Sequence, residues 1–230
     1  GFNAGSTLSG SDLRLAVVAV NTMLAGAAGG FASLMYMKAT AKTFDVAMMC
    51  NGALAGLVAI TAPSAFVSPL AAVFIGTVGG LLVVWVAGFV ERRLKLDDPV
   101  GAVAVHGANG IWGMVALGLF ADGTYGAGLN GVAGAVTGLL YGDAGQFTAQ
   151  LIAVTVAMLW GFGLSYGFFK LYDKLFGLRV PAADELGGLD LPEMGALAYP
   201  EFVLAGESAA PEAASMVVPM HRPAATAAGD

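Results

Sequence analysis

Apolar runs about as long as a bilayer is thick recur along this chain, and they constrain its fold more than any other feature. A helix takes roughly 20 residues to cross about 30 Å of hydrocarbon. Five segments reach that length: residues 15–37, 46–66, 70–90, 100–121 and 148–170. The chain is 57% hydrophobic and 11% charged, whereas soluble domains carry roughly twice that charge. The sequence therefore predicts an all-α polytopic membrane protein with about five complete spans.

The basic residues orient these spans. They follow the first, third and fifth segments, and they are Lys38, Lys42, Arg92, Arg93, Lys95, Lys170, Lys174 and Arg179. The loops on the other side, 67–69 and 122–147, contain neither lysine nor arginine, and only Arg14 precedes the first span. By the positive-inside rule the basic clusters face the cytoplasm. Residues 1–14 are then outside, and the tail after residue 171 is inside.

Two further patterns refine the picture of the spans. A sixth apolar piece, residues 128–140, is too short to cross and is expected to be re-entrant or to lie at the surface. Glycines one helical turn apart predict close helix packing, although a chain with 34 glycines also produces such pairs by chance. The pairs are Gly26 with Gly30, Gly52 with Gly56 and Gly76 with Gly80.

The sequence divides into four parts. Residues 1–14 are expected to be the extracytoplasmic end of a truncated helix and a loop, and residues 15–170 the transmembrane domain. Residues 171–203 carry charges and prolines and are expected to form an ordered cytoplasmic tail. The Ala- and Pro-rich end, residues 204–230 with His221, is expected to be disordered because it has little to pack. Since no signal-peptide pattern opens the chain, it is interpreted as the C-terminal portion of a longer protein.

One ionisable side chain, His106, lies inside the fourth apolar run. Histidine exchanges protons near neutral pH, and an ionisable group at membrane depth usually faces a pathway or a partner rather than lipid. The alternative is a buried core histidine that is hydrogen-bonded to a neighbouring helix, and the chemistry alone leaves both open. Asn109 lies one turn further on and is expected to share the face of His106. The pattern favours transport of something small and protonatable.

Other polar residues have simpler expected roles. Asp97 and Asp98 stand at the start of the fourth span, where the helix dipole favours capping over a direct role in transport. Asn51 lies within the second span, and it is expected to tie two helices together rather than to touch a substrate. Phe2 and Ser6 precede the first span, and taken alone they are expected to be interface anchors.

Five motifs in order change these expectations. They are Gly-Phe-Asn-Ala-Gly-Ser (1–6), Cys-Asn-Gly-Ala-Leu-Ala-Gly-Leu-Val-Ala-Ile-Thr-Ala (50–62), Asp-Asp-Pro…Val-His-Gly (97–107), Gly-Asp-Ala-Gly-Gln-Phe (142–147) and Gly-Leu-Arg-Val…Gly-Leu-Asp (177–190). Together they resemble the ammonium transporter family (Amt/MEP, related to the Rh proteins). The resemblance covers residues 1 to about 203, and it includes the topology.

The resemblance implies a fold and a set of site residues. The family has eleven transmembrane helices and forms trimers with one pore per subunit, and its two five-helix halves are an inverted repeat. By resemblance this chain begins at the outer end of the sixth helix and carries the seventh to the eleventh. Phe2 matches a phenylalanine of the stacked pair that gates the outer pore, and Ser6 matches the serine of the outer recruitment site. His106 matches the second of the twin pore histidines.

The function implied by the resemblance is transport of ammonium or ammonia across the cell membrane. Ammonium would lose its proton beyond the gate, ammonia would cross a hydrophobic pore, and the histidines would relay the proton. We expect no enzyme activity, no cofactor and no metal. Two alternatives stay open: an ammonium sensor with the same fold, and an Rh-like gas channel for ammonia or carbon dioxide. The Asp-Asp-Pro and Gly-Leu-Asp motifs fit the Amt branch better.

The expected partners are ammonium or ammonia, membrane lipid and two further copies in a homotrimer, and no nucleic acid is expected. Many family members end with Gly-Leu-Asp…His-Gly-Glu-x-Ala-Tyr, but here Met194 and Ala196 replace the histidine and the glutamate. The loss of these polar groups puts regulation by a PII-type signal protein in doubt. The tail could still dock through Leu191, Met194 and Tyr199.

Overall fold

The computed structural model describes residues 1–199, apart from the side chain of Asn130. The expected disordered end, residues 204–230 with His221, lies outside this range. The described residues form α-helices joined by short 3-10 and π turns and contain no β-strand, which confirms the all-α class. The chain divides into two units, Gly1–Tyr166 and Gly167–Asp230, and each is described by itself.

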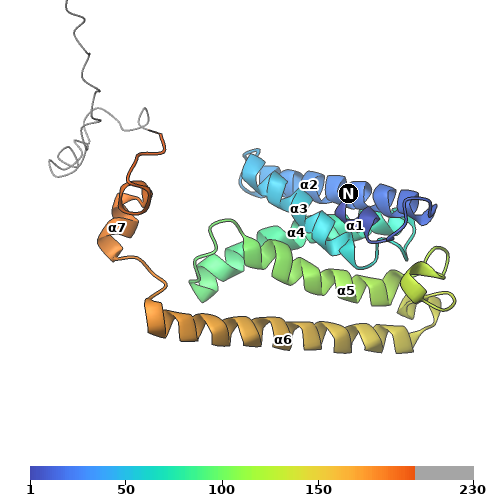
Figure 1. The fold of residues 1–230 in the computed structure, drawn as a ribbon. Coiled ribbons are helices and arrows are strands. Elements are labelled where there is room, and N and C mark those ends of the chain that lie inside the picture. Colours follow the sequence, from blue (N-terminus) through green and yellow to red (C-terminus); the bar gives the residue numbers. More distant parts are fainter. Residues whose placement is uncertain (200–230) are drawn as a thin grey trace, which may run out of the picture. The chain divides into compact units, whose positions relative to one another are not determined.

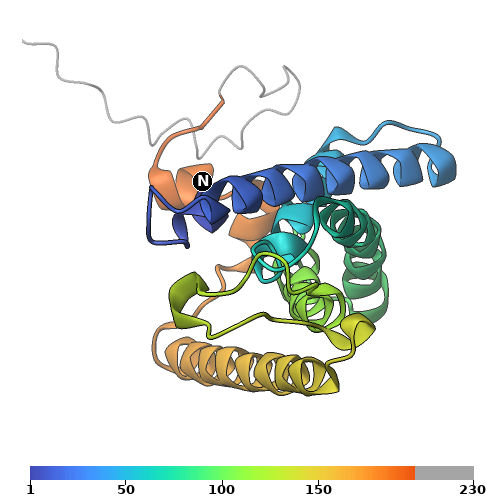
Figure 2. The ribbon, with the colours of Figure 1, turned by 90° about the vertical axis from the view of Figure 1, so that its right-hand side faces the viewer.

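The first unit is a bundle of helices. Helices α1 (Phe2–Gly5), α2 (Arg14–Thr40), α3 (Val46–Thr61), α4 (Pro69–Phe89) and α5 (Asn109–Phe120) pack together. The unit also contains most of α6 (Ala144–Phe176), which is exposed along most of its length. Helix α4 continues into the π turn η1 (Val90–Leu94), and the π turn η2 (Val103–Ala108) leads into α5. Both views show α2, in dark blue, on one side of α3 and α4 (Figure 1 and Figure 2). The π turn η2 packs against α3 and α4, so it is attached to the centre of the bundle.

Four helical stretches are long and apolar enough to cross a membrane. They are Arg14–Thr40, Pro69–Leu94, Val103–Phe120 and Ala144–Phe176. They lie close to the first, third, fourth and fifth predicted spans. Their lengths and apolar composition fit the expected polytopic membrane fold.

The second predicted span, residues 46–66, is wrong in its length. Helix α3 ends at Thr61 after 16 residues, because Pro63 has no N–H with which to continue the helical ladder. A turn follows, and the buried side chain of Asn21 holds it. The Asn21 Nδ2 donates to the carbonyl oxygens of Ser64 and Val67, each at 2.9 Å. The chain thus reverses earlier than its hydropathy suggests.

Side-chain caps fix the starts of α3 and α4. The Asp45 carboxylate accepts a hydrogen bond from the Met48 N–H, and the Ser68 hydroxyl accepts one from the Ala71 N–H. Pro69 occupies the first turn of α4, where its missing N–H has no helical partner to lose. Local sequence therefore determines where these two helices begin.

Glycines bring the backbones of α2, α3 and α4 into direct contact. A Cβ on Gly56 or on Gly76 would collide with the carbonyl oxygen of Ala25. A Cβ on Gly80 would collide with the carbonyl oxygen of Gly29. The remaining paired glycines, Gly26, Gly30 and Gly52, also have neighbouring atoms within 3.3 Å of where a Cβ would stand. The close packing predicted from the glycine pairs is therefore confirmed.

The apolar piece at residues 128–140 does not span. It contains two single 3-10 turns, η3 (Leu129–Gly131) and η4 (Leu139–Tyr141), within an extended connection between α5 and α6. Backbone hydrogen bonds tie this connection to the bundle, from Asp122 N–H to the Phe66 carbonyl and from Gly138 N–H to the Ala121 carbonyl. No helix long enough to span forms in this stretch, as predicted, and its re-entrant or surface location stays a prediction.

The second unit contains the end of α6 and two short elements, α7 (Ala182–Gly187) and the π turn η5 (Asp190–Met194). Gly177 ends α6 with a φ of +76°, a conformation that favours glycine. Arg179 then forms a two-point ion pair with Glu185, whose pKa these hydrogen bonds hold below its ordinary value. Part of the expected tail is thus structured, and its cytoplasmic location stays a prediction.

We expect Gly56→Val to destabilise the bundle, because the new side chain would collide with the Ala25 carbonyl and force α2 and α3 apart. Overpacking of this kind costs about 1–3 kcal/mol, and more where backbone atoms obstruct the new group. Thermal unfolding in detergent, followed by circular dichroism, would measure the change.

Gly163→Ala is the matched control, because a Cβ on Gly163 meets nothing within 4 Å. It should leave the unfolding temperature unchanged or raise it slightly, since alanine is the better helix former. Equal destabilisation by both variants would contradict the role given to backbone contact.

Candidate functional site

His106 lies in η2 and is exposed in this chain. Its neighbours Ala104 and Val105 are buried with Ala55 and Val83 between α3 and α4, which turns the imidazole away from the core. Among the described residues no hydrogen bond of the imidazole is found. The exposed imidazole is compatible with the expectation that His106 faces a pathway or a partner, whereas the alternative of a core histidine bonded to a neighbouring helix is not found in the described part of the chain. The imidazole is exposed because Ala104 and Val105 occupy the side of η2 that packs against α3 and α4.

Asn109 does not share the face of His106, which corrects a second expectation. The Asn109 side chain is 0% exposed, and its Nδ2 donates to the carbonyl oxygen of Ala104 at 3.0 Å. This bond spans five residues and satisfies a carbonyl within the wide π turn. The π turn changes the rotation per residue, so residues three apart no longer lie one above the other as they do in an α-helix. Asn109 thus fixes the junction of η2 and α5.

The surface around His106 is formed by small residues. Gly107 follows the histidine directly and is exposed. A Cβ on Gly110 would meet nothing within 4 Å, whereas a Cβ on Gly113, on the packed side, would lie 2.7 Å from the Ala59 carbonyl oxygen. One face of η2 and α5 is therefore closely packed, and the face with His106 is open.

The segment before η2 is held by two polar contacts. The carboxylate of Asp98 accepts hydrogen bonds from the Ala102 N–H at 2.7 Å and from the Val103 N–H at 3.0 Å, as a capping residue does. Asp97 is exposed and does not share this role. The Nδ2 of Asn51, on α3, lies 3.4 Å from where a Cβ on Gly101 would stand. The side chain of Asn51 therefore lies close to the entry to η2, and its expected role in tying two helices together stays a prediction.

Phe2 and Ser6 lie at the other candidate site, around α1. Phe2 is 89% exposed, and the Ser6 hydroxyl donates to the Phe2 carbonyl oxygen at 3.3 Å. Ser6 lines a hollow of about 190 Å³ together with the polar residues Asn3 and Thr7. The Asn3 Nδ2 donates to the Thr22 hydroxyl of α2 at 3.2 Å and anchors α1 to the bundle. Sequence reasoning passed over Asn3, although it stands inside the Gly-Phe-Asn-Ala-Gly-Ser motif.

The structure does not bring all three site residues together. The hollow beside Ser6 is formed by α1, α2, the turn after α3 and the connection after α5, and His106 does not line it. Phe2 and Ser6 therefore belong to one end of the unit, and His106 belongs to a separate open face.

An ion pair stabilises the segment between α1 and α2. The Arg14 guanidinium donates to both carboxylate oxygens of Asp12 and, at 2.6 Å, to the carbonyl oxygen of Ala127. The hydrogen bonds from Arg14 hold the pKa of the Asp12 carboxyl below its ordinary value. One arginine thus connects the loop near Ser6 to the connection that precedes α6.

Comparison with known proteins gives a consistent result. A family model described as the Ammonium Transporter Family matches residues 1–199. Ammonium transporter Amt2 of Archaeoglobus fulgidus is 48% identical over 203 residues, which are 88% of this chain and 43% of that protein. The ammonium transporter of Bacillus subtilis is 34% identical over 199 residues, which are 86% of this chain and 48% of that protein. The chain thus spans less than half the length of these curated relatives.

Two solved structures resemble the fold. A structure titled Sensor Amt Protein matches with a TM-score of 0.72 at 38% identity, over 84% of this chain and 45% of that chain. Mep2 of Saccharomyces cerevisiae matches with a TM-score of 0.72 at 26% identity, over 79% of this chain and 40% of that chain.

We expect Asp98→Ala to destabilise the start of η2, because two backbone N–H groups lose their acceptor. Loss of a capping side chain costs about 1 kcal/mol. The control is Asp97→Ala, which removes the same charge from an exposed neighbour. Thermal unfolding of both variants in detergent would test the assignment, and equal losses would contradict it.

The Asp12–Arg14 pair should make stability depend on pH. Because the pKa of Asp12 is lowered in the folded state, the pair stabilises the fold above the carboxyl's unfolded pKa of about 3.9 and loses this effect as pH falls further. Wild type should therefore unfold at a higher temperature than Asp12→Asn at pH 7, and the difference should shrink below about pH 4. A difference that grows on acidification would contradict this sign.

Proposed function

Because this chain belongs to the ammonium transporter family, we propose that it forms part of a pathway that carries ammonium or ammonia across the cell membrane. The observation that carries the proposal is the exposed His106 on a helix long and apolar enough to span a membrane. The names of the relatives, as ammonium transporters, support the choice of substrate. Transport of this kind breaks no covalent bond other than the one to the transferred proton, so no cofactor enters the proposal.

His106 is proposed to handle the proton. An imidazole offers one donor and one acceptor when neutral and takes up a proton near neutral pH, so it can bind ammonia and pass on a proton. A bare cation pays several kcal/mol to enter an apolar pore. Ammonium avoids this penalty by losing its proton, whereas potassium has no proton to lose. The pore is then selective because potassium pays the full free-energy cost of entering it, whereas ammonium does not.

Phe2 and Ser6 are proposed to act before this step, at the mouth. The Ser6 hydroxyl can accept a hydrogen bond from ammonium. The exposed ring of Phe2 offers an aromatic face, and such a face attracts a cation by about 0.5–2 kcal/mol. Their position at one end of the unit, away from His106, is compatible with recruitment and gating there and proton transfer deeper in.

The open face around His106 suggests how the pathway is completed. The chain spans 43–48% of the length of the two curated relatives, so those relatives contain further sequence that could cover such a face. We propose that the rest of a longer protein supplies the second wall. Assembly as a homotrimer is proposed from the family resemblance, and docking of a PII-type protein would have to use a tail in which Met194 is exposed.

An ammonium sensor is the second candidate. It is favoured by the solved structure titled Sensor Amt Protein, which is 38% identical to this chain, against 26% for Mep2 of Saccharomyces cerevisiae. Ammonium-dependent current in proteoliposomes that hold the full-length protein separates the two, with potassium as the control ion. Current with ammonium alone supports a selective transporter. Binding of ammonium with neither current nor a change of internal pH supports the sensor.

We expect His106→Ala in the full-length protein to abolish normal ammonium selectivity, because the pore loses its hydrogen-bonding and proton-relaying group. The measurement is uptake of ammonium together with the exclusion of potassium in the same vesicles. His221→Ala removes the other histidine of the chain and should leave both properties unchanged. Wild-type uptake and wild-type exclusion of potassium by His106→Ala would refute the role of His106.

A further inference from the structure

The side-chain amide of Asn109 is fully buried three residues after His106, and the transport function proposed above does not use it. Its Nδ2 donates to the Ala104 carbonyl oxygen at 3.0 Å, whereas its Oδ1 has no hydrogen-bond partner in the described part of the chain. A buried polar atom without a partner costs stability. The reason for an asparagine at this position therefore has to be sought in the bond that its Nδ2 makes.

That bond has the spacing of a π turn. In an α-helix each carbonyl oxygen pairs with the N–H four residues further on, whereas a π turn joins groups five residues apart. Asn109 stands five residues after Ala104, and its side chain supplies a donor at this spacing. Its backbone N–H donates to the His106 carbonyl oxygen as well. Asn109 thus holds the C-terminal end of η2 with both its backbone and its side chain.

The π turn determines which way His106 faces. Residues three apart in a regular α-helix stand about 60° apart around the axis, so His106 would there face nearly the same way as the buried Asn109. The wide turn rotates the chain less per residue and separates the two directions, and His106 is exposed. Ala104 and Val105 fill the buried side in its place. The direction of the imidazole therefore depends on the turn that the Asn109 amide holds.

A glycine on α4 makes room for this amide. A Cβ on Gly79 would lie 2.9 Å from the Asn109 Oδ1, and 3.2 Å from the Ala55 carbonyl oxygen. A side chain at position 79 would therefore displace the amide while leaving Asn109 itself unchanged. The amide can thus be perturbed from two different helices.

We propose that Asn109 is a positioning residue for His106. Its amide holds η2 as a π turn and thereby keeps the imidazole on the open face, where the proposed proton transfer takes place. Asn109 itself touches neither ammonium nor ammonia, because it is buried on the packed side of the helix. The effect on transport rests on the function proposed above for His106, but the direction of the imidazole can be measured without transport.

Solid-state NMR of the full-length protein in lipid bilayers, with nitrogen-15 in its histidines, measures the surroundings of the imidazole. The spectrum of His106→Ala identifies the resonances of His106 by their loss. Asn109→Leu keeps the branched shape of the side chain and removes the donor. We expect it to shift the His106 resonances, because the imidazole leaves the open face.

Asn21 provides the matched control. It too is fully buried, its Nδ2 donates to backbone carbonyl oxygens, and its Oδ1 has no partner among the described residues. It holds the turn after α3, however, and not η2. Asn21→Leu should lower the unfolding temperature and leave the His106 resonances in place. Equal shifts by the two leucine variants would indicate a general loosening of the bundle and would overturn the positioning role.

Uptake in vesicles gives the functional result. Asn109→Leu should reduce ammonium uptake per folded protein by roughly tenfold or more, because a displacement of about 1 Å at a reacting group has effects of up to about a hundredfold. Asn109→Gln keeps an amide donor and should restore part of the uptake. Asn21→Leu should retain wild-type uptake and wild-type exclusion of potassium.

Gly79→Ala guards against misfolding of Asn109→Leu. It adds one methyl group beside the amide, so it should shift the His106 resonances in the same way and reduce uptake less. Wild-type resonances in both Asn109→Leu and Gly79→Ala would overturn the proposal. So would wild-type uptake by Asn109→Leu in a protein whose uptake depends on His106.

Failure of the proposed function would be distinguishable from failure of this inference. If His106→Ala kept wild-type uptake and potassium exclusion, the role of His106 in transport would be refuted. A shift of the His106 resonances in Asn109→Leu, absent in Asn21→Leu, would still support the positioning of the imidazole by Asn109.

Discussion

Direct contact between the backbones of α2, α3 and α4 is the constraint on which the rest of the structure depends. Lipid tails are as apolar as leucine, so membrane helices gain little from burial and associate through close packing. Here the carbonyl oxygens of Ala25 and Gly29 lie against Gly56, Gly76 and Gly80, with no room for a side chain. Because backbone atoms do not change rotamer, this contact holds the three helices in one relative position, and the other elements pack onto it.

The same contact region decides which way the candidate proton-handling residue faces. Gly79 leaves space for the Asn109 side chain, whose Oδ1 lies 2.9 Å from where a Cβ on Gly79 would stand. Asn109, Ala104 and Val105 fill the side of the helix that meets α3 and α4. His106 is therefore turned outward by what its neighbours bury, and its exposure follows from the packing of glycine and alanine at the centre.

Sequence reasoning succeeded where the determinants are local. The length of an apolar run predicts most of the spans, and glycine spacing predicts the packed faces, because both depend on residues within one segment. It failed where a distant residue decides the outcome. Pro63 ends helix α3, but the chain reverses there because Asn21, on another helix, holds the turn that follows. The separation of His106 from Asn109 depends on a π turn, which periodicity of 3.6 residues does not anticipate. The roles of Phe2 and Ser6 came from the resemblance alone, whereas His106 was also singled out as the ionisable side chain inside the fourth apolar run.

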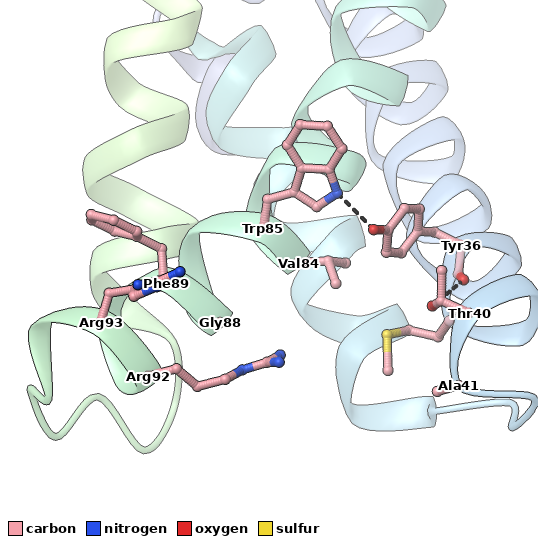
Figure 3. A pocket seen from close by; sticks show the side chains of 10 residues that line it. Tyr36, Thr40, Ala41, Val84, Trp85, Gly88, Phe89, Arg92 and Arg93 are labelled. Carbon is pink, nitrogen blue, oxygen red and sulfur yellow. Dashed lines mark hydrogen bonds between the residues drawn. The ribbon is translucent and has the colours of Figure 1, made fainter.

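Arginines near the two ends of α2 differ in whether they have a carboxylate partner, and this difference indicates what each end meets in its surroundings. At its start, Arg14 is satisfied inside the chain by Asp12 and by the Ala127 carbonyl, so this end needs no outside anion. Near its end, α2 lines a hollow together with Arg92 and Arg93 (Figure 3), for which the described part of the chain supplies no carboxylate. Guanidinium groups at the boundary of a membrane span are stable when anions of the surroundings approach them. The positive-inside pattern is thus matched by the pairing of the arginines. The arginine on the predicted outer side has a carboxylate partner, and the two arginines on the predicted inner side have none in the described part of the chain.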